Sequence, residues 1–178
     1  IQNGITGGGL MTIYFGDGSS QTSAAAGKFN KITTMTSSST GYRNGSETHF
    51  TAYNMNVVPY SSSSRIIVHV QLWGSCGSGW YGVGFRLKRN GNLINNAASG
   101  NRPGVHGGAG EPHGGSIECY NFMVVDHPNT TNTVQYQLYG GNYDSDGELY
   151  LARSQDDANN NEHLRYSTSM VAYDVFPG

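Results

Sequence analysis

The sequence predicts an all-β protein, an antiparallel β-sandwich of jelly-roll type with a short extended N-terminal segment. Two features of its composition favour this fold class: only 12% of the residues are charged, and the chain contains 26 Gly. Ser, Thr and Asn supply most of the other polarity, which is typical of short strands joined by tight turns. A third feature is the supply of 12 Tyr, 6 Phe and 2 Trp, large side chains that can fill a core. The 178 residues suffice for one ordinary domain with an extension.

Residues 1–28 differ from the rest of the chain and form the predicted extension. They contain a Gly-rich lead, one strand-like run from Met11 to Phe15, a Gly-Asp-Gly turn and then small residues. Because this segment carries too little apolar area to fold alone, we expect it to lie on the following domain or on neighbouring chains. The predicted organisation is therefore an extended shaft or linker segment over 1–28 and a β-sandwich head domain over 29–178.

From Phe29 onward, runs with period-2 alternation or with β-branched and aromatic residues recur between turn clusters. Strands at this spacing favour two packed sheets. The predicted strands are Phe29–Thr36, Thr48–Val58, Arg65–Trp73, Trp80–Arg89, Ser116–Asp126, Thr133–Tyr139, Glu148–Arg153 and Arg165–Phe176. The predicted turns are Arg43–Ser46, Ser61–Ser64, Asn90–Asn92, Pro128–Asn129 and Asp146–Gly147. The clearest hairpin signal is the run Phe85–Arg89 followed by Asn90-Gly91.

Two further segments are predicted to be loops. Residues 96–115 contain Gly, Pro and little that can pack, and a structureless stretch of this length is usually a functional or a mobile loop. Residues 154–164 are rich in Asn and Asp with few apolar side chains, so a loop is favoured there over a helix.

Charge and hydropathy exclude several classes of partner. The net charge is −2 and no run of Lys and Arg forms a stripe that would track phosphates, so we expect no nucleic-acid partner. No apolar segment is long enough to span a bilayer, so we expect no membrane insertion. The chain has no G-x-S-x-G elbow, and neither cysteine has an activating neighbour, so we expect no enzymatic activity.

Three residue types have structural interpretations. Cys76 and Cys119 are expected to be buried thiols, with a single disulfide between them as the alternative. His69 lies in an alternating run and is expected to be packed and hydrogen-bonded, and Trp73 is expected to be mostly buried.

Two sets of residues are candidate metal ligands, although no cofactor is predicted as required. Asp144, Asp146 and Glu148 have a spacing that places oxygen ligands around a turn, which Ca²⁺ accepts, but a plain hairpin turn with Gly147 at positive φ is favoured. His106 and His113 share the long loop and can supply imidazole nitrogens to a metal, but solvated loop histidines are the simpler interpretation.

Aromatic side chains beside small polar residues make a candidate ligand site. Trp80, Tyr81 and Tyr143 can stack on sugar faces, while Asn142 and Asp144 can hydrogen-bond sugar hydroxyls. The alternative is that the strand aromatics belong to the core.

The run over residues 13–23, IYFGDGSSQTS, is similar to an FGDGT-like signature of tail-fibre and other structural proteins of tailed phages, especially marine ones. The segments 59–68, 87–91, 136–140 and 151–154 resemble the globular domains at the C-terminal ends of such proteins, whereas the long Gly-Pro-His loop and both cysteines depart from them. The resemblance implies a homotrimer, a jelly-roll or C1q-like head and a place on the virion. It also implies that three loops meeting on the trimer axis would bring His106 and His113 together as a six-His site.

The function expected from this resemblance is that of a non-enzymatic virion protein. As the distal head of a trimeric tail fibre, it would bind other virion proteins and a host surface receptor, either a glycan or a protein. The alternative is a capsid decoration, head-fibre or connector protein with a purely structural role. A third hypothesis is a free, secreted, lectin-like module.

Overall fold

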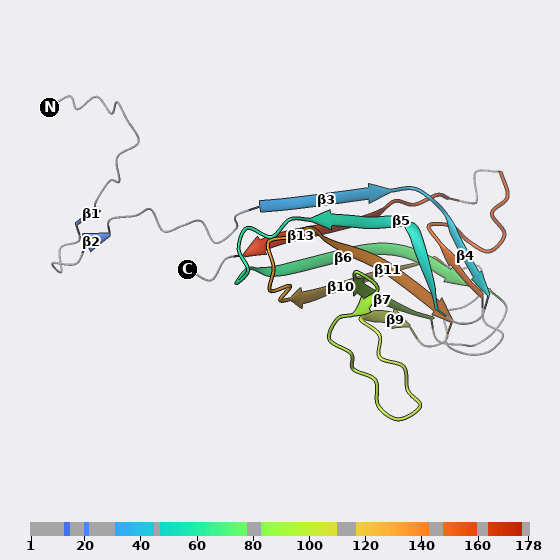
Figure 1. Ribbon diagram of the computed structural model, residues 1–178. Coiled ribbons are helices and arrows are strands. Elements are labelled where there is room, and N and C mark those ends of the chain that lie inside the picture. The colour runs from blue at the N-terminus through green and yellow to red at the C-terminus, as the bar shows by residue number, and fades with distance from the viewer. Residues whose placement is uncertain are drawn as a thin grey trace, which may run out of the picture.

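The computed structural model describes residues 13–14, 20–21, 31–44, 47–77, 83–109, 117–142, 148–159 and 164–175. These residues form strands joined by turns and loops (Figure 1). The strands are β1 (Ile13–Tyr14), β2 (Ser20–Gln21), β3 (Lys31–Ser37), β4 (Gly41–Asn44), β5 (Thr48–Val57), β6 (Arg65–Cys76), β7 (Val83–Arg89), β8 (Asn92–Leu93), β9 (Gly107–Ala109), β10 (Glu118–Asp126), β11 (Val134–Asn142), β12 (Glu148–Leu151) and β13 (Thr168–Val175). Within these ranges, no helix is long and apolar enough to cross a membrane.

Alternation of side chains between the two faces of each strand explains where these strands form. In β6, Ile66, Val68 and Val70 are fully buried, while Arg65 and His69 point outward. In β13, buried Met170 and Ala172 alternate with half-buried neighbours in the same way. Each of the eight strands predicted from the sequence therefore has a counterpart, namely β3, β5, β6, β7, β10, β11, β12 and β13.

The strands form two antiparallel sheets whose pairing is that of one long hairpin rolled up on itself. Along the chain, the first main strand pairs the last (β3 with β13), and the second pairs the next to last (β5 with β11). The series continues inward with β6 on β10 and with β7 on the short β8 and β9. One sheet thus contains β3-β13-β6-β10, and the other contains β5-β11-β7 with β8 and β9. This nested order confirms the predicted jelly roll.

Two shorter strands extend the first sheet. β12 pairs with the C-terminal part of β6, and β4 pairs with β12. β4 corrects the turn predicted at residues 43–46, because Arg43 and Asn44 belong to a strand. Near the N-terminus, β1 and β2 pair with each other. The domain boundary predicted near Lys28 stays a prediction.

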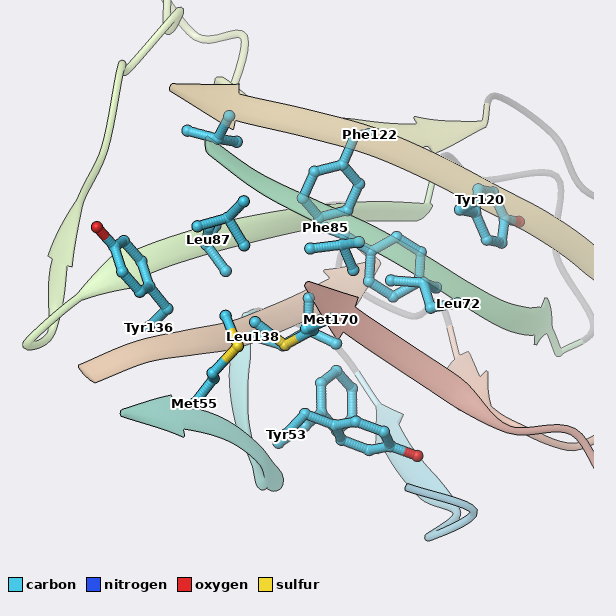
Figure 2. Close-up of a cluster of buried hydrophobic side chains, with 14 of the residues drawn as sticks. Tyr53, Met55, Leu72, Phe85, Leu87, Tyr120, Phe122, Tyr136, Leu138 and Met170 are labelled. Atoms are coloured by element: carbon cyan, nitrogen blue, oxygen red, sulfur yellow. The ribbon is translucent and has the colours of Figure 1, made fainter. Parts of the chain in front are cut away.

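The core lies between the two sheets and contains large aromatic and aliphatic side chains (Figure 2). Tyr53, Phe85 and Tyr136 are almost fully buried there, together with Leu72 and Leu138. Each such side chain contributes about 1.5–3 kcal/mol by burial. The aromatic supply seen in the composition therefore serves the sandwich core.

The connection between β7 and β8 confirms the hairpin predicted there. Asn90 and Gly91 have φ values of 49° and 81°, which a two-residue turn of type I′ requires at both positions. The Asn90 side chain accepts a hydrogen bond from the Gln135 backbone N–H at 2.8 Å, so the turn is tied to β11. The turn predicted at Ser61–Ser64 is also present, with a 3.0 Å bond from the Ser64 N–H to the Ser61 carbonyl.

Both cysteines are thiols, and only one of them is buried as expected. Cys76 points into the core from β6. Cys119, on β10, is aligned with Trp73 of β6 and is exposed. Because their side chains lie on opposite faces of one sheet, they are not placed to form a bridge. The expectation of a second buried thiol is therefore wrong.

One other expectation needs correction. His69 is exposed rather than packed, since it has the opposite parity to buried Val68 and Val70. The expectation for Trp73 is confirmed: its side chain is mostly buried and stacks on Tyr166, with ring centroids 4.8 Å apart.

The loop predicted over residues 96–115 is not structureless in its described part. It contains the strand β9 and an isolated bridge between Ser99 and Arg102. The loop predicted over 154–164 is confirmed for residues 154–159, which contain no helix.

Candidate functional site

The structure places three candidate surfaces on the sandwich: one end of it, the outer face of the sheet that contains β7, and the outer face of the sheet that contains β6.

The segments that carry most of the predicted site residues start from one end of the sandwich. Val83 of β7 pairs with Asn142 of β11 on one side and with Ala109 of β9 on the other. Beside them, the Gly77 N–H donates to the Glu148 carbonyl at 3.0 Å. We call these five residues the loop-bearing end.

The predicted ligand and metal residues follow or precede these anchors directly. Trp80 and Tyr81 lie between Gly77 and Val83 in sequence, while Tyr143, Asp144 and Asp146 lie between Asn142 and Glu148, and His113 follows Ala109. All six lie outside the described residues, as does the side chain of Asn142. The structure thus anchors their segments at one end, and the ligand and metal sites stay predictions.

Glu148 is the described member of the predicted calcium set, and two tyrosines hold its carboxylate. The hydroxyls of Tyr42 and Tyr150 donate to its two oxygens, each at 2.8 Å. Burial, followed by the hydrogen bond to Glu148 and its charge, raises the pKa of Tyr150 to about 12. Among the described residues, no group of three or more His, Cys, Asp and Glu side chains is placed to hold a metal ion.

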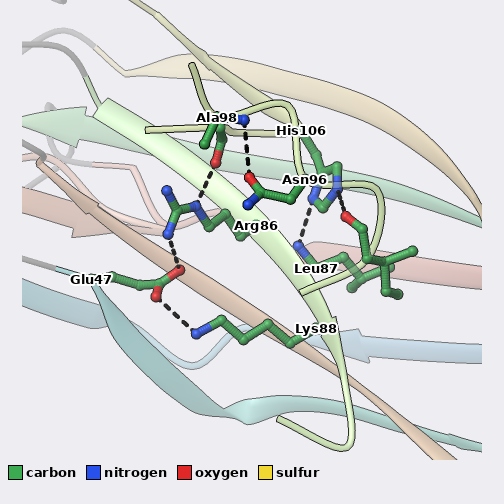
Figure 3. A network of polar contacts seen from close by, with 9 residues as sticks. Glu47, Arg86, Leu87, Lys88, Asn96, Ala98 and His106 are labelled. Atoms are coloured by element: carbon green, nitrogen blue, oxygen red, sulfur yellow. Dashed lines mark hydrogen bonds and ion pairs between the residues drawn. The ribbon is translucent and has the colours of Figure 1, made fainter. Parts of the chain in front are cut away.

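His106 has a structural role that its sequence context did not indicate (Figure 3). Its Nδ1 accepts a hydrogen bond from the Leu87 N–H at 2.9 Å, and its Nε2 lies 2.7 Å from the Ile94 carbonyl, to which it donates. Burial and the nearby charge of Arg86 lower the pKa of His106, which favours this neutral tautomer. Both ring nitrogens therefore fasten the 94–106 loop onto β7, and in this arrangement neither is open to a metal.

The outer face of the β7 sheet is polar and internally paired. Glu47 bridges Arg86 at 3.3 Å and Lys88 at 2.8 Å (Figure 3). The Lys88 ammonium lies 4.0 Å from the centre of the Tyr139 ring, and His49 stacks on that ring at 4.7 Å. The charged groups Glu47, Arg86 and Lys88 are thus paired with one another, so we interpret this network as support for the sheet.

The outer face of the β6 sheet has a different character. The strand register aligns Ile32, Tyr173, Ile67 and Val125 in one row across β3, β13, β6 and β10. The next row aligns Thr34, Val171, His69 and Met123. We call these two rows the apolar face.

The apolar face is open to solvent and contains no carboxylate or ammonium group. Met123 is 65% exposed and Ile32 is 58% exposed. His69, Met123 and Tyr173 also border a shallow hollow in this face, together with Asn121 and Phe122. Antiparallel sheets with one solvated face normally carry polar side chains outward, as the β7 sheet does.

Our interpretation of the sequence missed this surface, although a signal for it is present. In β6 the run Ile66-Ile67-Val68 and in β10 the run 122–125 (FMVV) are apolar at both parities. Continuous apolar runs indicate strands that are buried on both faces. Core packing explains the apolar residues on the inward faces of these strands but not those on the outward faces.

Comparisons with known proteins find only distant structural similarity. No protein-family model and no curated protein matches the chain. Solved structures of the infectious bursal disease virus Gx and Gt strains are each 14% identical, with TM-scores of 0.39 and 0.40, and both matches cover 83% of this chain. A mutant VP2 protein of the same virus, in T=1 particles, is 14% identical over 84% of this chain, with a TM-score of 0.42. The chain spans 37–38% of the length of these proteins.

Proposed function

We propose that this chain is a non-enzymatic structural component of a virus particle, a decoration, head-fibre or connector module that binds neighbouring protein subunits. The observation that carries the proposal is the apolar face. Ile32, Val125 and Met123 are all exposed on it, and no opposite charge would attract a charged ligand to its two rows. Contiguous exposed apolar surface of this kind marks a protein contact.

The chemistry of the apolar face favours a protein partner over other ligands. A nucleic acid needs Lys and Arg side chains, and the two rows contain none, since Lys31 and Arg65 lie beyond them in the register. A small ligand needs an enclosing pocket, whereas the hollow beside His69 is shallow and open. Placement on a virus particle is supported by the phage-like signature over residues 13–23.

Purified particles of the virus that encodes this chain provide the test. Immunogold labelling with an antibody against the head domain is expected to decorate the particles, and mass spectrometry is expected to find the chain at a fixed ratio to the capsid protein. If washed particles lack the chain, the proposal is wrong.

Adding separately produced, labelled chain to particles tests the surface. Met123→Lys is expected to weaken co-sedimentation with the particles, because a lysine in the apolar face must be desolvated on binding. Thr51→Lys is the matched control, since Thr51 is exposed on β5 in the other sheet. Equal loss in both variants would contradict a role for the apolar face.

A second candidate function, receptor binding, is favoured by one specific observation. Val83 pairs with both Asn142 and Ala109, so the segments that carry the predicted aromatic and polar ligand residues share one end of the sandwich. A glycan array probed with the intact chain tests this function. Binding that is lost in Trp80→Ala and Tyr143→Ala but kept in Met123→Lys would support it, and an array without binding would contradict glycan recognition.

A further inference from the structure

We infer that the apolar face binds the same face of a second copy of this chain. The inference rests on the proposed assembly function and names the partner of that surface. Three properties carry it: the relief of the face, its charge and its area.

The apolar face carries both a protruding side chain and a hollow, the two elements that a self-complementary contact needs. Met123 is the most exposed of its side chains, and the shallow hollow lies beside it, between Met123, His69 and Tyr173. A two-fold axis near His69 would place the Met123 side chain of each copy in the hollow of the other. Methionine suits this role because its unbranched side chain adapts to irregular gaps. Contacts of this kind, in which one patch meets itself, are the rule in symmetric dimers.

The charge of the face also favours a second copy. Its two rows contain no Asp, Glu, Lys or Arg, so pairing two copies brings no fixed like charges together in the centre. Arg65 pairs with Val175, one step beyond the rows, where it can stay in solvent. A partner that binds through charge would find no counter-charge here, whereas a twisted apolar sheet packs readily on another one. Within the described residues, the other sheet offers no such surface, because its outer face carries Lys88, Arg86 and amide side chains.

The area of the face predicts the strength of the contact. The whole outer face of these four strands, about 4.8 Å apart and about eight residues long, presents roughly 500 Å² per copy, and the two apolar rows make up about half of it. A face-to-face pair would therefore bury on the order of 1,000 Å² in total, at the lower limit for a specific interface. We thus expect a dimer that forms and dissociates with concentration rather than a permanent one.

Sedimentation equilibrium of the full chain over a wide concentration range is the experiment. The mass is expected to rise from that of the 19.1 kDa monomer towards that of a dimer as the concentration increases. Met123→Lys is expected to raise the dissociation constant by roughly tenfold or more, because two ammonium groups would face each other across the axis. Ile32→Lys, at a second exposed position, is expected to act in the same direction, and Thr51→Lys is expected to have no effect.

Circular dichroism and thermal unfolding of each variant serve as folding controls. Both are expected to match wild type, because substitutions at exposed positions leave the core unchanged. A wild-type chain that stays monomeric at every concentration would overturn the inference. So would a dimer or trimer that persists unchanged in both Met123→Lys and Ile32→Lys.

The particle experiment separates this inference from the proposed function. If the chain dimerises through the apolar face but is absent from particles, the self-pairing stands and the virion role fails. If the chain binds particles through the apolar face and never self-associates, the virion role stands and the self-pairing is wrong.

Discussion

Asp126 is a buried carboxylate whose charge is balanced inside the sandwich. The Arg89 Nη1 donates to both of its oxygens at 2.9 and 2.8 Å, and the Tyr136 hydroxyl donates to one of them at 2.8 Å. Burial, and then the charge of Asp126, raises the pKa of Tyr136, so the phenol stays protonated and remains a donor. This cluster joins β7, β10 and β11 near the Asn90 turn.

Removing the arginine is expected to destabilise the protein more than removing the phenol does. Arg89→Met leaves the buried Asp126 carboxyl group without its cation, which costs about 3–5 kcal/mol. Tyr136→Phe removes one hydrogen bond and leaves the ion pair, at a cost of about 1–2 kcal/mol. Urea unfolding of both variants measures the difference. If Arg89→Met unfolds at the same urea concentration as wild type, the ion pair contributes nothing to stability.

The His106 imidazole is expected to make stability fall under acid conditions. Its pKa is lowered by burial in the folded chain, while the unfolded imidazole takes up a proton near pH 6.5. As pH falls through that value, the unfolded state binds more protons than the folded state, so the free energy of unfolding decreases. As pH rises again, this contribution is regained.

His106→Gln isolates this contribution, because glutamine does not titrate. The variant is expected to be less stable than wild type at about pH 7.5, and the gap is expected to narrow at about pH 5. Denaturant unfolding at the two pH values measures both gaps. A gap that is equal at the two values would show that His106 does not titrate between them.

At the scale of elements, the β7–β8 hairpin depends on the left-handed backbone of its turn. A Cβ added to Gly91 would meet no atom within 4 Å, so any cost of substitution comes from its φ of 81°. Gly91→Ala is therefore expected to cost about 1–2 kcal/mol, and Gly91→Asn less, since Asn adopts this conformation more readily. Thermal unfolding of the two variants measures the difference. Equal losses would mean that the conformation of the turn is not what matters.

The sequence-based prediction of elements succeeded where alternation and turn chemistry coincide. β6 and β13 show clear period-2 burial, and Asn90-Gly91 specifies its own turn. β9 was missed because its residues, Gly107–Ala109, have no β propensity; Gly107 packs closely on Phe122 instead. Such a strand is created by its partner β7 and not by its own side chains.

The candidate sites were harder to predict, because they depend on which faces come together. The roles of His106 as a loop fastener and of Glu148 as an acceptor for two tyrosines depend on partners distant in sequence, such as Ile94, Leu87 and Tyr42. The apolar face was visible only as an excess of apolar residues in β6 and β10. Recognising it requires the register that aligns Met123 with His69 and Val171.

At the scale of the whole molecule, the nested pairing determines how the chain must fold. β3 and β13 are adjacent in the sheet although almost the whole described chain lies between them. Closing such long loops is entropically costly before any contact compensates for it. We expect refolding in milliseconds to seconds, measured by stopped-flow tryptophan fluorescence through Trp73, which stacks on Tyr166. Complete refolding within microseconds would contradict this expectation.

The opposed orientations of the two cysteines make Cys119 a ready attachment point for a probe. Burial raises the pKa of the Cys76 thiol and keeps it inside the core, so a maleimide is expected to react with Cys119 alone. Cys119 is aligned with Trp73 and points outward from the same sheet as the apolar face. A fluorophore placed there would lie at the margin of the proposed contact without any mutation. Its emission would then report, in the native chain, when a partner covers that side of the sandwich.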